Sequence, residues 1–135
     1  MANFYGTART NYFKVKDEEK FKEFVNSMPD LHLIEDGEGR FGFYSESPDS
    51  GCFPSSYWDD ETDEDIDIDI VGETAEHLAE GEVAIFMEAG AEKCRYINGW
   101  ATAVNHTGEY VNISLMDIYK LAKEKFGIKP TLAEY

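Results

Sequence analysis

The sequence predicts one α+β domain built on a mostly antiparallel sheet of about five to seven strands with two or three helices. Three observations lead to this fold class. The 135 residues are 42% apolar, which suits one hydrophobic core and is too little chain for two ordinary domains. Short segments that alternate apolar and polar residues recur along the chain. Other segments space apolar residues three and four positions apart, as amphipathic helices do.

The first elements are a strand and a helix. Residues 10–16 alternate well enough to predict a strand, and residues 3–9 form a weaker extended candidate before it. A helix should follow, because Asp17 can cap its first turn and Pro29 ends it. Its buried face is predicted to hold Phe21, Phe24, Val25 and Met28.

Two short strands, residues 31–35 and 40–45, should then form a hairpin around the turn Asp36-Gly37-Glu38-Gly39. The glycines of this turn accept the positive φ angles that tight hairpins require. The order strand, helix, strand, strand resembles a ferredoxin-like arrangement. That fold hosts many unrelated functions, so the resemblance indicates no activity.

The second half starts with a long surface loop over residues 46–63, which is rich in Ser, Pro, Asp and Gly. A short helix is predicted over residues 71–79. Three strands should follow, over residues 82–89, 93–104 and 109–114. A last helix should be capped by Ser114, stop at Gly127 and bury Leu115, Ile118, Leu121, Ala122 and Phe126. We expect a single domain over residues 1–135, with the acidic segment 46–70 between its two halves and a loose tail over 128–135.

The negative charge is concentrated in the middle of the chain. The net charge is −16, and no Lys or Arg occurs from Phe41 to Glu92, although that stretch holds sixteen acidic residues. The remaining residues hold twelve acids and twelve bases, so their charges cancel. Adaptation to high salt would spread acidity over the whole surface, and this local excess therefore needs its own explanation.

The densest part of this acidic segment runs from Asp59 to Ile70. Eight of its first eleven residues are acidic. Strict alternation puts Asp65, Asp67 and Asp69 on one side and Ile66, Ile68 and Ile70 on the other. This pattern predicts a strand half buried on the sheet, whose carboxylates repeat about every 6.6 Å. Such a rigid row of carboxylates can imitate part of a phosphate backbone.

Three interpretations of this acidic run, residues 59–70, stay open. It can be a solvated edge strand, since charges on an edge discourage aggregation. It can bind a partner whose Lys- and Arg-lined groove relieves the mutual repulsion of the carboxylates. It can also bind calcium, because Asp65, Asp67, Asp69, Glu73 and Glu76 occupy EF-hand positions 1, 3, 5, 9 and 12. Position 6 opposes calcium, because Ile70 stands where an EF-hand needs glycine.

No catalytic signature is present. The three histidines (His32, His77 and His106) lack metal-ligand spacing, and Cys52 and Cys94 lack a CxxC partner. The segment from Gly37 to Gly42 matches no nucleotide-binding loop. We therefore expect a protein that is not an enzyme, with no catalytic residues, no metal and no cofactor. The start of the chain lacks a secretory signal, which predicts a cytoplasmic protein.

In size, acidity and lack of catalytic residues, the chain resembles the small inhibitors that bacteriophages and plasmids encode against host defence, of the anti-CRISPR or antirestriction kind. The resemblance is one of general character and transfers no residues. It implies an inhibitor in the host bacterial cytoplasm that mimics nucleic acid and occupies the basic DNA- or RNA-binding surface of a nuclease or surveillance complex, without binding nucleic acid or membrane itself.

The expected partner-binding residues share acidity or an aromatic ring near the acidic run. They are Tyr57, Trp58, Asp59, Asp60, Glu61, Asp63, Glu64, Asp65, Asp67, Asp69, Glu73, Glu76 and Glu80. An immunity or antitoxin protein that binds a basic toxin is the alternative, and it would use the same acidic surface. The sequence leaves the oligomeric state open.

Overall fold

The computed structural model describes residues 5–46, 51–92 and 95–133. Six strands form one antiparallel sheet in the order β2-β3-β1-β6-β7-β8, and two more form a separate hairpin, β4-β5. The fold class is therefore the predicted one, a mostly antiparallel α+β fold. The elements are β1 (Tyr5–Thr10), α1 (Glu18–Ser27), β2 (Leu31–Glu35), β3 (Phe41–Ser45), β4 (Ser56–Asp59), β5 (Glu64–Asp67), α2 (Ile70–His77), β6 (Val83–Glu92), β7 (Tyr96–Asn105), β8 (Tyr110–Ser114) and α3 (Asp117–Phe126).

A β-α-β-β-α-β unit forms the centre of the fold. β1 pairs with β3 on one side and β6 on the other, and β2 pairs with β3, all antiparallel. β1 and β2 therefore run parallel with β3 between them, and the order β6-β1-β3-β2 is that of ferredoxin-like folds. The hairpin β4-β5 is inserted between β3 and α2, while β7, β8 and α3 extend the unit after β6.

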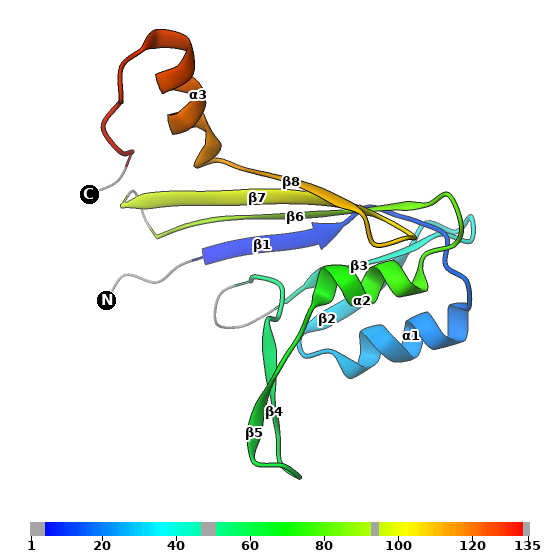
Figure 1. Ribbon diagram of the computed structural model, residues 1–135. Coiled ribbons are helices and arrows are strands. Elements are labelled where there is room, and N and C mark those ends of the chain that lie inside the picture. Colours follow the sequence, from blue (N-terminus) through cyan, green and yellow to red (C-terminus); the bar gives the residue numbers. More distant parts are fainter. Residues whose placement is uncertain (1–4, 47–50, 93–94, 134–135) are drawn as a thin grey trace.

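Helices α1 and α2 cover one face of the sheet (Figure 1). The Asp17 carboxylate accepts the Lys20 N–H at 3.1 Å and caps α1 as predicted, and the Phe21 and Val25 side chains are fully buried. Phe21 packs edge-on against Phe13 with ring centroids 5.6 Å apart. The core lies between the two helices and the inward side chains of the sheet, such as Phe86.

The turn between β2 and β3 has the predicted form. Gly37 and Gly39 have φ angles of 80° and 83°, which side chains with a Cβ rarely adopt. The Asp36 carboxylate accepts the backbone N–H groups of Glu38 and Arg40 at 2.8 and 3.2 Å. This turn aligns Glu35 with Phe41 and fixes the register of the hairpin.

Two strand predictions were wrong in position. The strand is residues 5–10, whereas residues 11–16 make only the isolated bridges Phe13↔Phe41 and Val15↔Leu78. Residues 5–10 form the strand because they lie in the middle of the sheet and pair with β3 on one side and β6 on the other. β6 also continues to Glu92, beyond the predicted end at residue 89, because each of its residues pairs with β7.

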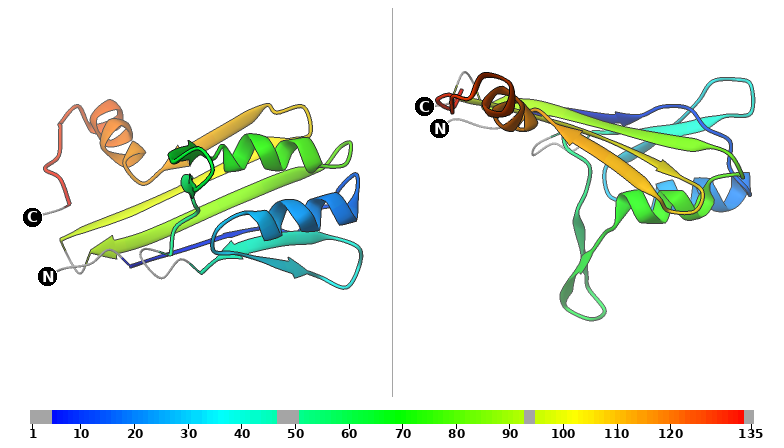
Figure 2. Two further views of the ribbon diagram at one scale, coloured as in Figure 1. Left: turned by 90° about the horizontal axis from the view of Figure 1, so that it is seen from below. Right: turned by 45° about the horizontal axis from the view of Figure 1, so that its top comes forward.

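Within the described part of the chain, no helix packs against the second face of the sheet (Figures 1 and 2). Helix α3 lies on that side, but it stands beyond the end of β8 rather than across the sheet. The predicted burial of Leu115, Ile118, Leu121, Ala122 and Phe126 was therefore wrong: Ala122 is half-buried, and the other four are 52–68% exposed. The N-cap of α3 is Met116 instead of the predicted Ser114. The backbone N–H of Ser114 donates to the Asp117 carboxylate at 2.8 Å.

Among the described residues, no helix is both long and apolar enough to cross a membrane.

Candidate functional site

The acidic run forms a hairpin that projects away from the body of the protein (Figures 1 and 2). β4 pairs with β5 from Ser56↔Asp67 to Asp59↔Glu64, in a sheet of its own. No residue from Ser55 to Asp69 is buried, and the structure describes all of them. The sequence predicted this segment as a half-buried strand of the main sheet, and that prediction was wrong. We call residues 56–67 the acidic hairpin.

The tip of the acidic hairpin is shaped by its own carboxylates. Asp59 accepts the Glu61 backbone N–H at 3.0 Å and the Thr62 hydroxyl at 3.2 Å, and its carbonyl accepts the Asp63 N–H at 2.8 Å. Asp63 takes a positive φ of 58°, which Asp tolerates better than most residues. The turn therefore holds the exposed Asp60 and Glu61 at the far end of the hairpin.

The two faces of the acidic hairpin differ. Directly paired residues of an antiparallel ladder share a face, so Trp58 lies beside Asp65, with Asp67 one same-face position further on. Trp58 is 55% exposed. The opposite face pairs Tyr57, which is 41% exposed, with the half-buried Ile66. One face thus presents an aromatic ring next to two carboxylates about 6.8 Å apart.

The isoleucines do not dock the carboxylates on the main sheet. The predicted alternation holds within β5, but Ile66 faces Tyr57, Ile68 only partly reaches the core and Ile70 already belongs to α2. The attachment of the hairpin comes from its two ends instead. Phe53 precedes it and Ile70 follows it, both buried in the core, while the Ile68 N–H donates to the Ser55 carbonyl at 2.9 Å.

The remaining predicted site residues are spread along α2 and do not continue the hairpin. Asp69 caps the helix by accepting the Gly72 N–H at 3.0 Å. Glu73 is half-buried, and burial, reinforced by the neighbouring charges of Asp69 and Glu76, raises its pKa. Glu76 is exposed. Glu80 is exposed beyond the end of α2 that lies away from the hairpin.

The helix places the ring of His77 against α1. This ring stacks on Phe24 with centroids 4.8 Å apart. Burial lowers the pKa of His77. Positions 70, 74 and 77 share one helical face, and Ile70 and Thr74 are buried, so the spacing itself contained this signal.

No protein-family model, no curated protein and no solved structure matches the chain. The site therefore rests on its own geometry. Among the described residues, no group of three or more His, Cys, Asp or Glu side chains is arranged to hold a metal ion. The segment considered for calcium is not one loop, because Asp65 and Asp67 lie in a strand and Glu73 and Glu76 in a helix. Cys94 lies outside the described residues.

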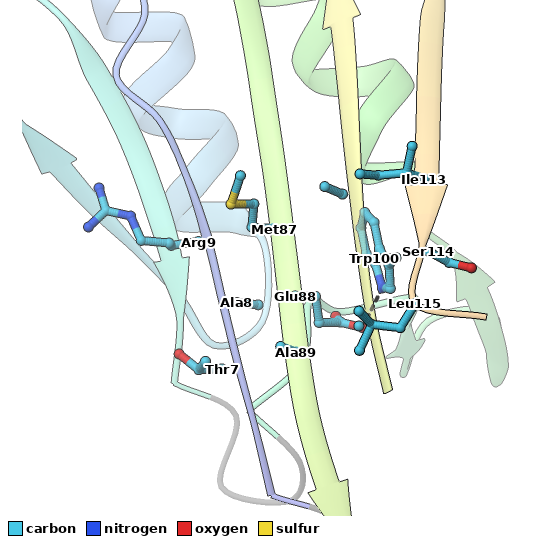
Figure 3. A pocket seen from close by; sticks show the side chains of 12 residues that line it. Thr7, Ala8, Arg9, Met87, Glu88, Ala89, Trp100, Ile113, Ser114 and Leu115 are labelled. Atoms are coloured by element: carbon cyan, nitrogen blue, oxygen red, sulfur yellow. Dashed lines mark hydrogen bonds between the residues drawn. The ribbon is translucent and has the colours of Figure 1, made fainter. Parts of the chain in front are cut away.

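A groove on the uncovered face of the sheet was missed by the sequence analysis. It has a volume of about 410 Å³. Its lining includes the small residues Ala89, Gly99 and Ala101 of the neighbouring strands β6 and β7, and the larger Met87, Ile113 and Leu115, which Figure 3 labels. The continuous apolar run Val83–Met87 could have indicated an apolar outer face, because such a run is typical of a strand whose two faces are both covered.

Glu88 is one of the sixteen acidic residues between Phe41 and Glu92, and it has a structural role. Its side chain accepts the Phe53 backbone N–H at 2.8 Å and, as Figure 3 shows, the Trp100 indole N–H at 2.6 Å. It thereby joins β6, β7 and the loop that leads into the acidic hairpin. Two N–H donors to one carboxylate make this a strong attachment.

Proposed function

We propose that the chain is a protein-binding inhibitor that inserts its acidic hairpin into a basic DNA- or RNA-binding groove of a nuclease or defence complex. The observation that carries the proposal is the projection of the hairpin away from the fold with its charges uncompensated. Its acidic residues are Asp59, Asp60, Glu61, Asp63, Glu64, Asp65 and Asp67, and it contains no Lys or Arg.

The position of the hairpin argues against a mere solubility device. The edges of the main sheet are β2 and β8, so the acidic hairpin protects neither of them. A two-stranded hairpin without a covered face is marginally stable in water, and repulsion among its carboxylates lowers that stability further. A basic partner would relieve the repulsion and release counterions, as nucleic-acid binding does.

The shape of the hairpin supports nucleic-acid mimicry. A two-stranded ribbon is narrow and carries side chains on both faces, so the acidic hairpin presents its carboxylates within a small width. On one face, the Trp58 ring lies directly across from Asp65, with Asp67 one same-face position further along β5, so this face combines an aromatic ring with two anions. Exposed Trp and Tyr rings commonly contribute the short-range binding energy at interfaces.

The test uses purified protein as bait in nuclease-treated bacterial lysate at low and high salt. The hairpin variant carries Asp63→Asn, Asp65→Asn and Asp67→Asn, and Asn also tolerates the positive φ at position 63. The matched control removes the same charge at the exposed Glu23, Glu35 and Glu109, each changed to Gln. The captured protein is then assayed for displacement of its labelled nucleic acid.

We expect wild type and control to capture the same basic nucleic-acid-binding protein and to displace its nucleic acid, with the effect lost as salt rises. The hairpin variant should weaken displacement about tenfold or more. Equal displacement by hairpin variant and control would refute the role of the hairpin. Capture of a basic toxin that binds no nucleic acid would support the immunity alternative instead.

A further inference from the structure

The outward positions of the main sheet carry no acidic residue. Residues that pair across β1, β6, β7 and β8 form outward rows, of which Arg9-Met87-Ala101-Ile113 is one and Ile85-Ala103-Val111 another. In all six described strands the outward residues include no Asp or Glu, although 28 of the 135 residues in the chain are acidic. An even distribution would place several acids there, so this face has the composition of a buried surface.

The groove on this face suits a helix. Its centre consists of the small residues Ala89, Gly99 and Ala101, while Met87 on one side and Ile113 on the other are 58% and 66% exposed. A Cβ added at Gly99 would come within 3.1 Å of the Leu115 side chain, so glycine keeps the groove open there. Small residues between larger ones allow a helix to approach a sheet closely.

Helix α3 has the complementary surface, which no described helix or strand of its own chain covers. Ile118, Leu121 and Phe126 lie on one side of the helix and are 60%, 56% and 68% exposed. None of the α3 residues, all of which the structure describes, is buried. The helix begins three residues after Ser114 ends β8, and it stands off the sheet on the side of the uncovered face (Figures 1 and 2).

The charge of this segment favours a strongly negative partner. From Leu115 onward the sequence contains Lys120, Lys123, Lys125 and Lys129 against Asp117, Glu124 and Glu134. This is a positively charged arm on a chain whose net charge is −16. The bodies of two copies repel each other, but the arm of one copy is attracted to the body of the other.

We propose that two copies of the chain associate through these surfaces, with the α3 helix of each copy lying in the groove on the uncovered sheet face of the other. A two-fold arrangement uses both surfaces twice. Three large apolar side chains line the groove and three belong to the arm: Met87, Ile113, Leu115, Ile118, Leu121 and Phe126. Counted in both copies, they bury on the order of 1,000 Å² in total, close to the lower end of the areas of specific dimers. The acidic hairpins project from the opposite face and stay free.

The test measures the mass of the full chain by sedimentation from about 1 µM to about 500 µM. The arm variant carries Ile118→Gln and Leu121→Gln, and the groove variant carries Ile113→Lys, which suits an edge strand but repels the lysines of α3. Tyr110→Gln is the matched control, because Tyr110 is 68% exposed on the covered side of β8. All replaced side chains are exposed, so each monomer should fold, as circular dichroism will verify.

We expect wild type and control to dimerise and each variant to weaken dimerisation at least about thirtyfold. A mixture of arm and groove variants should form heterodimers, because the intact arm of one fits the intact groove of the other. A wild type that stays monomeric throughout would overturn the proposal. So would a dimer that survives in the arm variant, or a mixture without heterodimers, since both results would mean that α3 does not occupy the groove.

Discussion

Replacing Glu88 by Gln tests whether this carboxylate fastens the loop before the acidic hairpin. Glu88 accepts two N–H groups, from Phe53 at 2.8 Å and from Trp100 at 2.6 Å. Gln has one acceptor oxygen, so its NH₂ group would face the second N–H donor. Hydrogen bonds to charged groups contribute about 1.5–3 kcal/mol each, and we expect the free energy of unfolding to fall by about 2 kcal/mol.

The assay is thermal and urea unfolding followed by far-UV circular dichroism. A loss of this size lowers the melting temperature by about 8 °C in a domain of this length. Glu109→Gln removes the same charge at an exposed position and should leave stability within about 0.5 kcal/mol of wild type.

A double-mutant cycle with Trp100→Phe isolates the bond to the indole. The indole N–H is the group that Phe lacks, so the two changes should couple by about 1 kcal/mol. Limited proteolysis gives an independent readout, because loss of the bond to Phe53 should expose the following segment to cleavage. A Glu88→Gln protein as stable as the Glu109→Gln control, with no coupling to Trp100, would refute the structural role of this carboxylate.

Three further perturbations test other parts of the structure. Burial lowers the pKa of His77, so the folded state disfavours protonation of its ring and wild type should lose stability as the pH falls below 6.5. His77→Phe keeps a ring on Phe24 and should lose less stability between about pH 8 and about pH 5. Equal changes in the urea midpoint of both proteins over that range would contradict this. Gly42→Ala places a Cβ well inside van der Waals contact with the Asn11 carbonyl oxygen and should cost about 3 kcal/mol in urea unfolding. A neutral result would mean that β3 and the segment after β1 are not packed as described. Replacing residues 56–67 by a short Gly-Ser linker should leave unfolding cooperative and the melting temperature within about 3 °C of wild type, because the hairpin adds no buried side chain and carries mutually repelling charges. Loss of cooperativity would show that the hairpin belongs to the core.

Local signals in the sequence were sufficient for the central unit of the fold. The cap at Asp17, the apolar spacing of Phe21 and Val25, and the glycines at 37 and 39 each determine a short segment by chemistry within a few residues. The order of these segments then indicated the α+β class, and the structure confirms it.

The wrong predictions concern apolar faces for which the sequence does not identify the surface that covers them. Ile118 and Leu121 have helical spacing, and that spacing indicates that the face will be covered but does not name the covering surface. The prediction assumed the protein's own core, whereas the structure leaves both residues exposed. In the same way, the alternation from Asp65 to Ile70 fits a strand of any sheet, and pairing with β4 was determined by the turn at Asp59 to Asp63, which the sequence analysis treated as part of a loop.

The place of the acidic hairpin in the chain has a consequence for synthesis on the ribosome. β1 pairs early with β3, since Arg9 meets Tyr44, but its other edge waits for β6, where Tyr5 meets Ala91. During this interval the nascent chain exposes an open strand edge to its neighbours, the arrangement that most readily leads to aggregation. The segment synthesised during this interval is residues 46–82, which includes the acidic segment 46–70. Its charge repels neighbouring nascent chains for as long as the central strand lacks its second partner.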